Sequence, residues 1–138
     1  TRQINFYNVD NSFYFVDLPG YGFSKMSKAE QIKVGEFIEH YLSTRKQIAL
    51  IVFLIDIRHS PTKNDVMMYN YIINTGFPCL VLANKADKLA TTKVDKAVAD
   101  LQNELNPLKD LKFLPFSSEK RIYSEAVWKE VDENLYLY

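Results

Sequence analysis

Two stretches of the chain are hydrophobic at almost every position. Residues 48–55 and 79–83 are apolar throughout, and the first of these runs is rich in β-branched side chains. This pattern is typical of strands that helices cover on both faces of a parallel sheet. The longer run, 48–55, is therefore predicted to be the central strand.

Helix signals surround these runs. Ser27 with Glu30, and Thr62 with Asp65, have the spacing of a helix start, and Gly76 ends the second of these helices. The apolar positions of the first helix, which is predicted to end at residue 44, are Ile32, Phe37, Ile38, Tyr41 and Leu42. Further helices are predicted over 92–105 and 122–136, and a short strand over 112–116.

The start of the chain has a different pattern. Aromatic-rich runs at 3–8 and 12–17 flank a turn at 9–11, which predicts an antiparallel hairpin. Beyond it, strands and helices alternate. The alternation predicts an α/β fold with right-handed crossovers and an open sheet, whose ligands bind at the loops leaving the carboxyl ends of the strands.

Composition narrows the class of protein. The 138 residues are 47% hydrophobic and 25% charged, with 17 basic side chains balancing 17 acidic ones. We therefore expect one soluble cytoplasmic domain over 1–138, with no membrane partner and no capture of nucleic acid by net charge. The single cysteine, Cys79, excludes an internal disulfide and is expected to be a buried, inert thiol.

The first loop of chemical interest is Asp17-Leu18-Pro19-Gly20, after the second predicted strand. A carboxylate here can hold Mg²⁺ through water, and the unobstructed amide of Gly20 can meet a terminal phosphate. An ordinary Pro-Gly turn explains the same residues. Both interpretations stay open for this loop taken alone.

The second loop, Asn84-Lys85-Ala86-Asp87, follows a buried strand and is more specific. Guanine carries a ring N–H beside an exocyclic amine, and the carboxylate of Asp87 can accept a hydrogen bond from each. Asn84 is suited to hold the base edge and tie adjacent loops. The aliphatic stem of Lys85 is suited to lie over the ring.

The third loop, Phe116-Ser117-Ser118, also ends a predicted strand. The backbone amide of Ser118 can donate to the carbonyl oxygen of guanine. A serine that caps a helix is the alternative for this loop alone. The order of the three loops, each at a strand end, favours a GTPase over three separate accidents.

With these three loops, the chain resembles the EngB (YsxC/YihA) family of GTP-binding proteins, within the Ras-like P-loop GTPase superfamily. The resemblance extends along the whole chain. The resemblance rests on Asn5-Phe6-Tyr7, Asp17 to Phe23, Asp56 to Pro61 with Asp65 and Met68, Asn84 to Lys88, and Phe116 to Ser118.

The resemblance implies a three-layer Ras-like fold and a GTP-binding switch. It implies slow GTP hydrolysis, action on a large ribosomal subunit precursor and its rRNA, and a need for the protein in normal cell division. Thr1 resembles the switch threonine that ligates Mg²⁺ together with Asp17. The residues implied to contact GTP, GDP or Mg²⁺ are Thr1, Arg2, Gln3, Asp17, Leu18, Pro19, Gly20, Asn84, Lys85, Ala86, Asp87, Phe116, Ser117 and Ser118.

One family motif is missing: the 138 residues contain no Gly-x-x-x-x-Gly-Lys-Ser/Thr. We therefore expect an N-terminally incomplete GTPase domain that lacks the first strand, phosphate loop and first helix. Such a chain is expected to be inactive, to bind GTP at best with millimolar affinity, and to leave two sheet edges unpaired. The fragment could then exchange strands or form oligomers, whereas the full-length protein is expected to be a monomer. A non-hydrolysing binding module is the alternative function.

A few other residues have two interpretations. Tyr21 stands where a Ras-type GTPase has a water-orienting glutamine, or simply packs on its loop. Asp56 and His59 are expected to organise a turn, without a catalytic role. Either rRNA contacts or a solvated helix face explain the basic residues Lys25, Lys28, Lys33, Arg45 and Lys46.

Overall fold

The computed structural model describes residues 4–20, 27–105 and 111–135. The chain forms two compact units, Thr1–Lys46 and Gln47–Tyr138. Predictions for Thr1, Arg2, Gln3, Tyr21 and Lys25 lie outside the described residues. No described helix is long and apolar enough to cross a membrane.

The first unit opens with the predicted hairpin. Strands β1 (Asn5–Val9) and β2 (Phe13–Asp17) pair antiparallel, and the N–H of Ser12 donates to the carbonyl of Val9 over 2.9 Å. Asp10 and Asn11 between the strands have φ of 51° and 56°. Two consecutive positive φ values match the right-handed twist of a hairpin, and Asn and Asp adopt them readily.

Helix α1 (Lys28–Thr44) follows, and the Ser27 side chain accepts a hydrogen bond from the Glu30 amide over 3.1 Å. The predicted apolar face was partly wrong, because Ile32 is 61% exposed and Phe37 is 39% exposed. Four-residue spacing selects a different buried stripe, which consists of Val34, Ile38 and Leu42.

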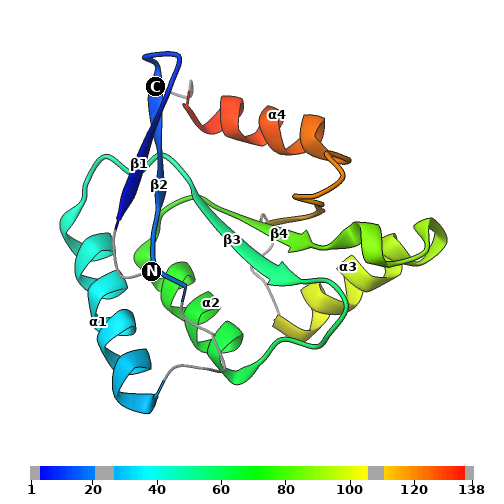
Figure 1. Cartoon of the computed structure of the whole chain (residues 1–138), viewed down its shortest axis with the longest axis horizontal. Helices are drawn as coiled ribbons and strands as arrows, with labels where there is room; N and C mark the ends of the chain where they lie inside the picture. Colours follow the sequence, from blue (N-terminus) through cyan, green and yellow to red (C-terminus); the bar gives the residue numbers. More distant parts are fainter. Residues whose placement is uncertain (1–3, 21–26, 106–110, 136–138) are drawn as a thin grey trace. The chain divides into compact units, whose positions relative to one another are not determined.

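The second unit contains a parallel three-stranded sheet in the order β3-β4-β5, of which β3 and β4 are labelled in Figure 1. Its strands are β3 (Ile51–Asp56), β4 (Cys79–Asn84) and β5 (Lys112–Pro115). Its helices are α2 (Lys63–Thr75), α3 (Thr91–Leu105) and α4 (Ser124–Leu135), with a 3₁₀ turn, η1 (Ala86–Lys88), between β4 and α3. The predicted alternation of strands and helices is confirmed.

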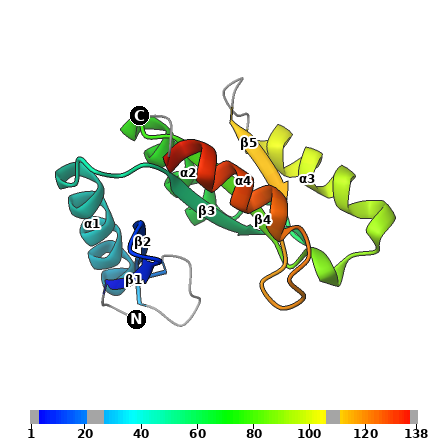
Figure 2. The same cartoon turned by 90° about the horizontal axis from the view of Figure 1, so that it is seen from above.

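Helices cover both faces of this sheet (Figure 2). Tyr69 of α2 packs against Phe53 and Phe113, which lie on one face, with tilted rings whose centroids are 6.5 and 6.3 Å away. On the opposite face, Lys112 of β5 pairs with Glu130 of α4. The sheet is therefore the middle layer of the unit.

The central strand is β4, not the longer apolar run. Residues Leu80 to Ala83 are at most 3% exposed, whereas Leu54 of β3 is 46% exposed. In the described sheet β3 has a neighbour on one side only, and α4 contacts the far edge strand β5, so Leu54 lacks cover. The strand also begins at Ile51 rather than residue 48, because pairing starts where Ile51 donates to Pro78.

The two sheets are separate in the described part of the chain. β2 pairs with β1, and β3 pairs with β4. Each sheet lies within one of the two compact units.

Candidate functional site

The residues predicted to read a base meet at one edge of the parallel sheet. Strand β4 ends at Asn84, and the described loop after β5 contains Phe116, Ser117 and Ser118. Parallel strands end at the same edge, which brings these loops together although about 30 residues separate them. Figure 1 shows this edge at the arrowheads of β3 and β4.

Backbone hydrogen bonds tie the two loops to each other. The Ala86 amide donates to the Phe116 carbonyl over 3.0 Å, and the Phe116 amide donates to the Ala83 carbonyl over 2.9 Å. Lys85 turns the chain between them with φ 66°, in the left-handed region. The loop after β4 is therefore held by its neighbour.

Asp87 is held by a buried serine. The Ser117 hydroxyl donates to Asp87 Oδ1 over 2.9 Å and accepts the Lys120 amide over 3.0 Å. Ser117 is fully buried, and the Asp87 side chain is 8% exposed. The hydroxyl fixes the carboxylate and leaves acceptor capacity on both oxygens. Sequence reasoning missed this contact, although it named both residues.

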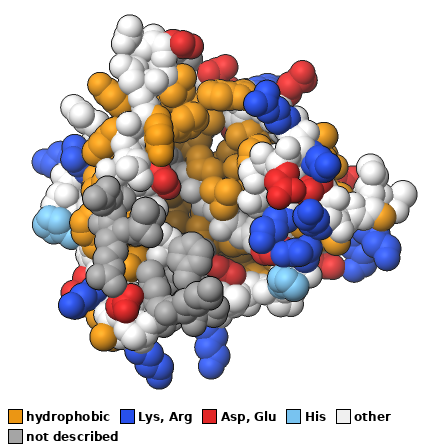
Figure 3. All heavy atoms as spheres, viewed as in Figure 1, with side chains coloured by type: hydrophobic (Ala, Val, Ile, Leu, Met, Phe, Trp, Pro, Cys, Tyr) orange, Lys and Arg blue, Asp and Glu red, His pale blue; other side chains and the backbone are white. Residues whose placement is uncertain are grey.

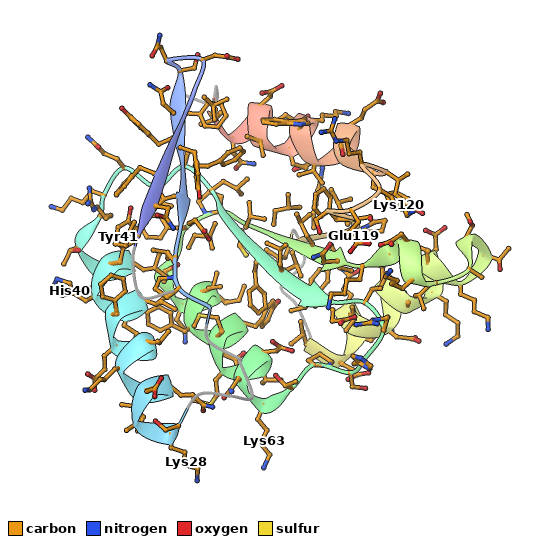
Figure 4. The ribbon with its side chains drawn as sticks, in the orientation of Figure 1. Lys28, His40, Tyr41, Lys63, Glu119 and Lys120 are labelled. Atoms are coloured by element: carbon orange, nitrogen blue, oxygen red, sulfur yellow. The ribbon has the colours of Figure 1, made fainter. Side chains whose placement is uncertain are left out.

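Ser117 accepts the Lys120 amide at a turn, not at a helix start, because α4 begins only at Ser124, so the alternative of a helix cap is wrong. Ser118, the next residue, is exposed. Figure 4 labels Glu119 and Lys120 in the same segment, and Glu119 lies 3.6 Å from Lys88. The two loops are thus joined by backbone hydrogen bonds, by the Ser117 hydroxyl and by the ion pair of Lys88 with Glu119.

Asn84 carries a buried polar atom without a partner. Its side-chain Oδ1 is buried, and no described group donates a hydrogen bond to it. Its backbone carbonyl accepts the Ile57 amide over 2.9 Å, which fixes the residue against the loop after β3. An unpaired buried acceptor costs about 1–3 kcal/mol, so this amide is suited to an incoming hydrogen-bond donor.

Asp56, at the end of β3, anchors a small charged network. It accepts hydrogen bonds from Arg58 Nε and Nη2 over 3.0 and 2.8 Å, and from the Arg58 amide over 2.9 Å. These bonds hold the pKa of Asp56 well below its usual range. Lys85 Nζ lies 3.5 Å from Asp56 Oδ2. The expected turn-organising role of Asp56 is confirmed.

Charges of both signs alternate around this edge. Figure 3 shows Lys and Arg side chains beside Asp and Glu side chains over the loops after β3 and β4, rather than a surface of one sign. The described pairs there are Arg58 with Asp56, Lys85 with Asp56, and Lys88 with Asp87 and Glu119. His59, in the same turn, is exposed.

The loop after β2 belongs to the first unit and has a different character. Asp17 is exposed, Pro19 is buried, and Leu18 and Gly20 are half-buried. Among the described residues no three His, Cys, Asp or Glu side chains gather as metal ligands would. The magnesium contact of Asp17 stays a prediction, and its predicted partner Thr1 lies outside the described residues.

Comparison with known proteins identifies the family. Residues 1–85 match the family described as "50S ribosome-binding GTPase". The "Probable GTP-binding protein EngB" of Geobacillus sp. (strain WCH70) is 40% identical over 135 residues, which cover 98% of this chain and 70% of that protein. The chain belongs to the EngB family of GTP-binding proteins.

Two further EngB relatives agree. The protein of Clostridioides difficile (strain 630) is 43% identical over 131 residues, which cover 95% of this chain and 64% of the relative. That of Levilactobacillus brevis is 39% identical over 132 residues, covering 96% and 67%. The chain thus spans about two thirds of the length of these relatives.

Solved structures show the same fold. A crystal structure of a probable GTP-binding protein engB matches with a TM-score of 0.84 and 23% identity, covering 97% of this chain and 82% of that one. Era in complex with MgGDPNP and a 16S ribosomal RNA segment matches with a TM-score of 0.72 and 23% identity, covering 95% and 44%. The predicted Ras-like GTPase fold is confirmed.

Proposed function

We propose that the full-length protein is a GTP-dependent switch that acts on a large ribosomal subunit precursor. The observation that carries the proposal is the buried Asp87 carboxylate, which Ser117 holds at the sheet edge where α/β folds bind ligands. The family supports a guanine nucleotide as the ligand.

In this proposal the base is read by groups from two loops. Asp87 accepts hydrogen bonds from the ring N–H and the exocyclic amine of guanine, and the Ser118 amide donates to the carbonyl oxygen. The stem of Lys85 lies over the ring. The unpaired Oδ1 of Asn84 takes a donor when the loops close on the nucleotide. Ala86, Phe116 and Ser117 shape the pocket through the contacts between the loops.

The other loop is proposed to serve the phosphates. Gly20 gives its amide to the third phosphate, and Leu18 and Pro19 set the course of the backbone. Mg²⁺ neutralises phosphate charge when bound, and Asp17 and Thr1 are the side chains that would hold it. Arg2 and Gln3 flank that threonine. The support here is the family resemblance and the position of Asp17 at the end of β2.

The ribosomal partner is supported by the description of the matching family, which names 50S ribosome binding. The basic residues on α1 and directly after it leave an rRNA contact open. Lys28 is exposed and points into solvent (Figure 4), whereas the guanidinium of Arg45, which follows α1, lies 5.0 Å from the ring centroid of Tyr41. A cytoplasmic location and a role in cell division stay predictions, and a binding module without turnover remains the second candidate.

Single-turnover hydrolysis by the full-length protein tests the switch. We expect slow hydrolysis of GTP alone and faster hydrolysis with large ribosomal subunits, since GTPases commonly gain rate from a partner that completes the site. Small subunits are the matched control. Fast hydrolysis that neither subunit changes would contradict the switch, and binding without hydrolysis in any mixture would favour the binding module.

A further inference from the structure

The Asp56 carboxylate is unusually well fixed for a side chain at a surface loop. Arg58 grips it with two guanidinium N–H groups and one backbone N–H, at 3.0, 2.8 and 2.9 Å. A planar guanidinium that binds both carboxylate oxygens fixes their orientation as well as their position. Asp56 thereby presents Oδ2 toward a second cation.

That second cation is Lys85, whose Nζ lies 3.5 Å from Asp56 Oδ2. The Lys85 side chain is 51% exposed, so packing does little to fix its rotamer. Its backbone has φ 66°, a conformation that residues other than glycine adopt when surrounding contacts demand it. The ion pair with Asp56 is therefore the described contact that orients the Lys85 side chain.

We propose that Asp56, clamped by Arg58, is a positioning residue for nucleotide binding: it holds the Lys85 ammonium so that the aliphatic stem is ready to cover the purine ring. The inference rests on the proposed function, in which Lys85 lies over the base. Asp56 itself touches no nucleotide in this account. It acts through Lys85.

The physical argument is one of preorganisation. An exposed ion pair adds little to folding stability. A long lysine side chain, however, loses several rotamers when a ligand fixes it, and a side chain already held in place loses fewer. A ring that covers the stem also removes water from the pair and strengthens it. The contribution of Asp56 should therefore appear in affinity more than in stability.

A double-mutant cycle on the full-length protein tests this. We would measure GDP affinity by calorimetry for wild type, Asp56→Asn, Lys85→Met and the double variant. Lys85→Met keeps an apolar stem and removes the charge. We expect each single variant to bind about two- to fivefold more weakly, and the double variant to bind no more weakly than the weaker single one.

The control is Asp100→Asn on α3, which removes an exposed ion pair of 2.9 Å with Lys96. It should leave GDP affinity unchanged. If the effects of Asp56→Asn and Lys85→Met simply multiply, or if Asp56→Asn binds like wild type, the inference is wrong. If Asp56→Asn does not fold, Arg58→Lys takes its place in the cycle, because lysine cannot bind both carboxylate oxygens of Asp56. If the effects of Arg58→Lys and Lys85→Met simply multiply, the inference is equally wrong.

The outcome also separates this inference from the proposed function. A wild-type protein that does not prefer guanine to adenine nucleotides would contradict the proposed function itself. A wild type that prefers guanine, together with multiplying effects in the cycle, would overturn the role of Asp56 alone.

Discussion

The loops after β2 and after β4 each carry an aspartate at a strand end, yet their surroundings differ. Asp87 is 8% exposed, and a buried serine donates to it. Asp17 is exposed at the end of β2. Neighbouring loops supply hydrogen bonds to the segment around Asp87, while no described cluster of metal-ligating side chains forms around Asp17.

This difference indicates two kinds of recognition. A base edge has fixed donors and acceptors, so a carboxylate that reads it gains from being held rigidly before the ligand arrives. A metal held through water tolerates an exposed carboxylate, because water completes its coordination. We therefore expect base selectivity to depend on the protein's own packing, and Mg²⁺ dependence to depend on Asp17.

The largest expected effect concerns Asp17. In the full-length protein, Asp17→Asn removes a charge that would hold Mg²⁺ through water, and we expect the Mg²⁺ concentration needed for GTP binding to rise about 10- to 100-fold. Titrations of Mg²⁺ at fixed GTP measure this. The matched control is Asp10→Asn in the hairpin turn, where asparagine keeps the positive φ of 51°. If Asp17→Asn needs no more Mg²⁺ for GTP binding than wild type does, the proposed difference between the two loops is wrong.

A smaller effect is expected from Ser117. Ser117→Ala removes the hydroxyl that donates to the Asp87 carboxylate, and hydrogen bonds to charged groups contribute about 1.5–3 kcal/mol. GTP affinity of the full-length protein should fall about tenfold by calorimetry. Ser118→Ala is the control, because the Ser118 side chain is exposed and only the backbone amide of this residue is proposed to contact the base. The side chain should therefore be dispensable. Equal losses in both variants would show that the buried hydroxyl has no special role.

The smallest effect concerns acid stability. Arg58 lowers the pKa of Asp56 below the ordinary value of 3.8, so the folded state binds this proton less tightly than the unfolded state. The stabilisation is present above that value and is lost as the pH falls below it. Urea unfolding from pH ~6 to ~3 should show Asp56→Asn losing less stability than wild type, by under about 1 kcal/mol. Identical pH profiles would contradict this.

Local signals predicted most elements of the fold. The paired Asp10 and Asn11 turn, the Ser27 and Thr62 caps and the Gly76 stop each depend on neighbours in sequence, and each is confirmed. The position of the central strand was wrong because hydrophobicity at Leu54 does not reveal which strands lie beside it. Strand order depends on pairing between distant segments.

The same limit applies to the candidate site. Asn84, Asp87 and Ser118 could be chosen because a motif at a strand end has a chemical meaning. The hydroxyl of Ser117 on Asp87, and the ammonium of Lys85 beside Asp56, join segments 30 and 29 residues apart. The available signal was the even spacing of Ser117 from Phe113, because alternate side chains of extended backbone point to the same side, and both residues are buried.

The most direct test of the account is the base preference of Asp87→Asn in the full-length protein. Asparagine replaces one acceptor oxygen with a donor amide, which opposes the exocyclic amine of guanine and suits the carbonyl of xanthine. Competition binding of GTP, XTP and ATP should show the variant losing GTP affinity and gaining XTP affinity, each by about 1–3 kcal/mol, with no gain for ATP in either form. A variant that keeps the wild-type preference for GTP over XTP would contradict the assignment of Asp87 as the reader of the base.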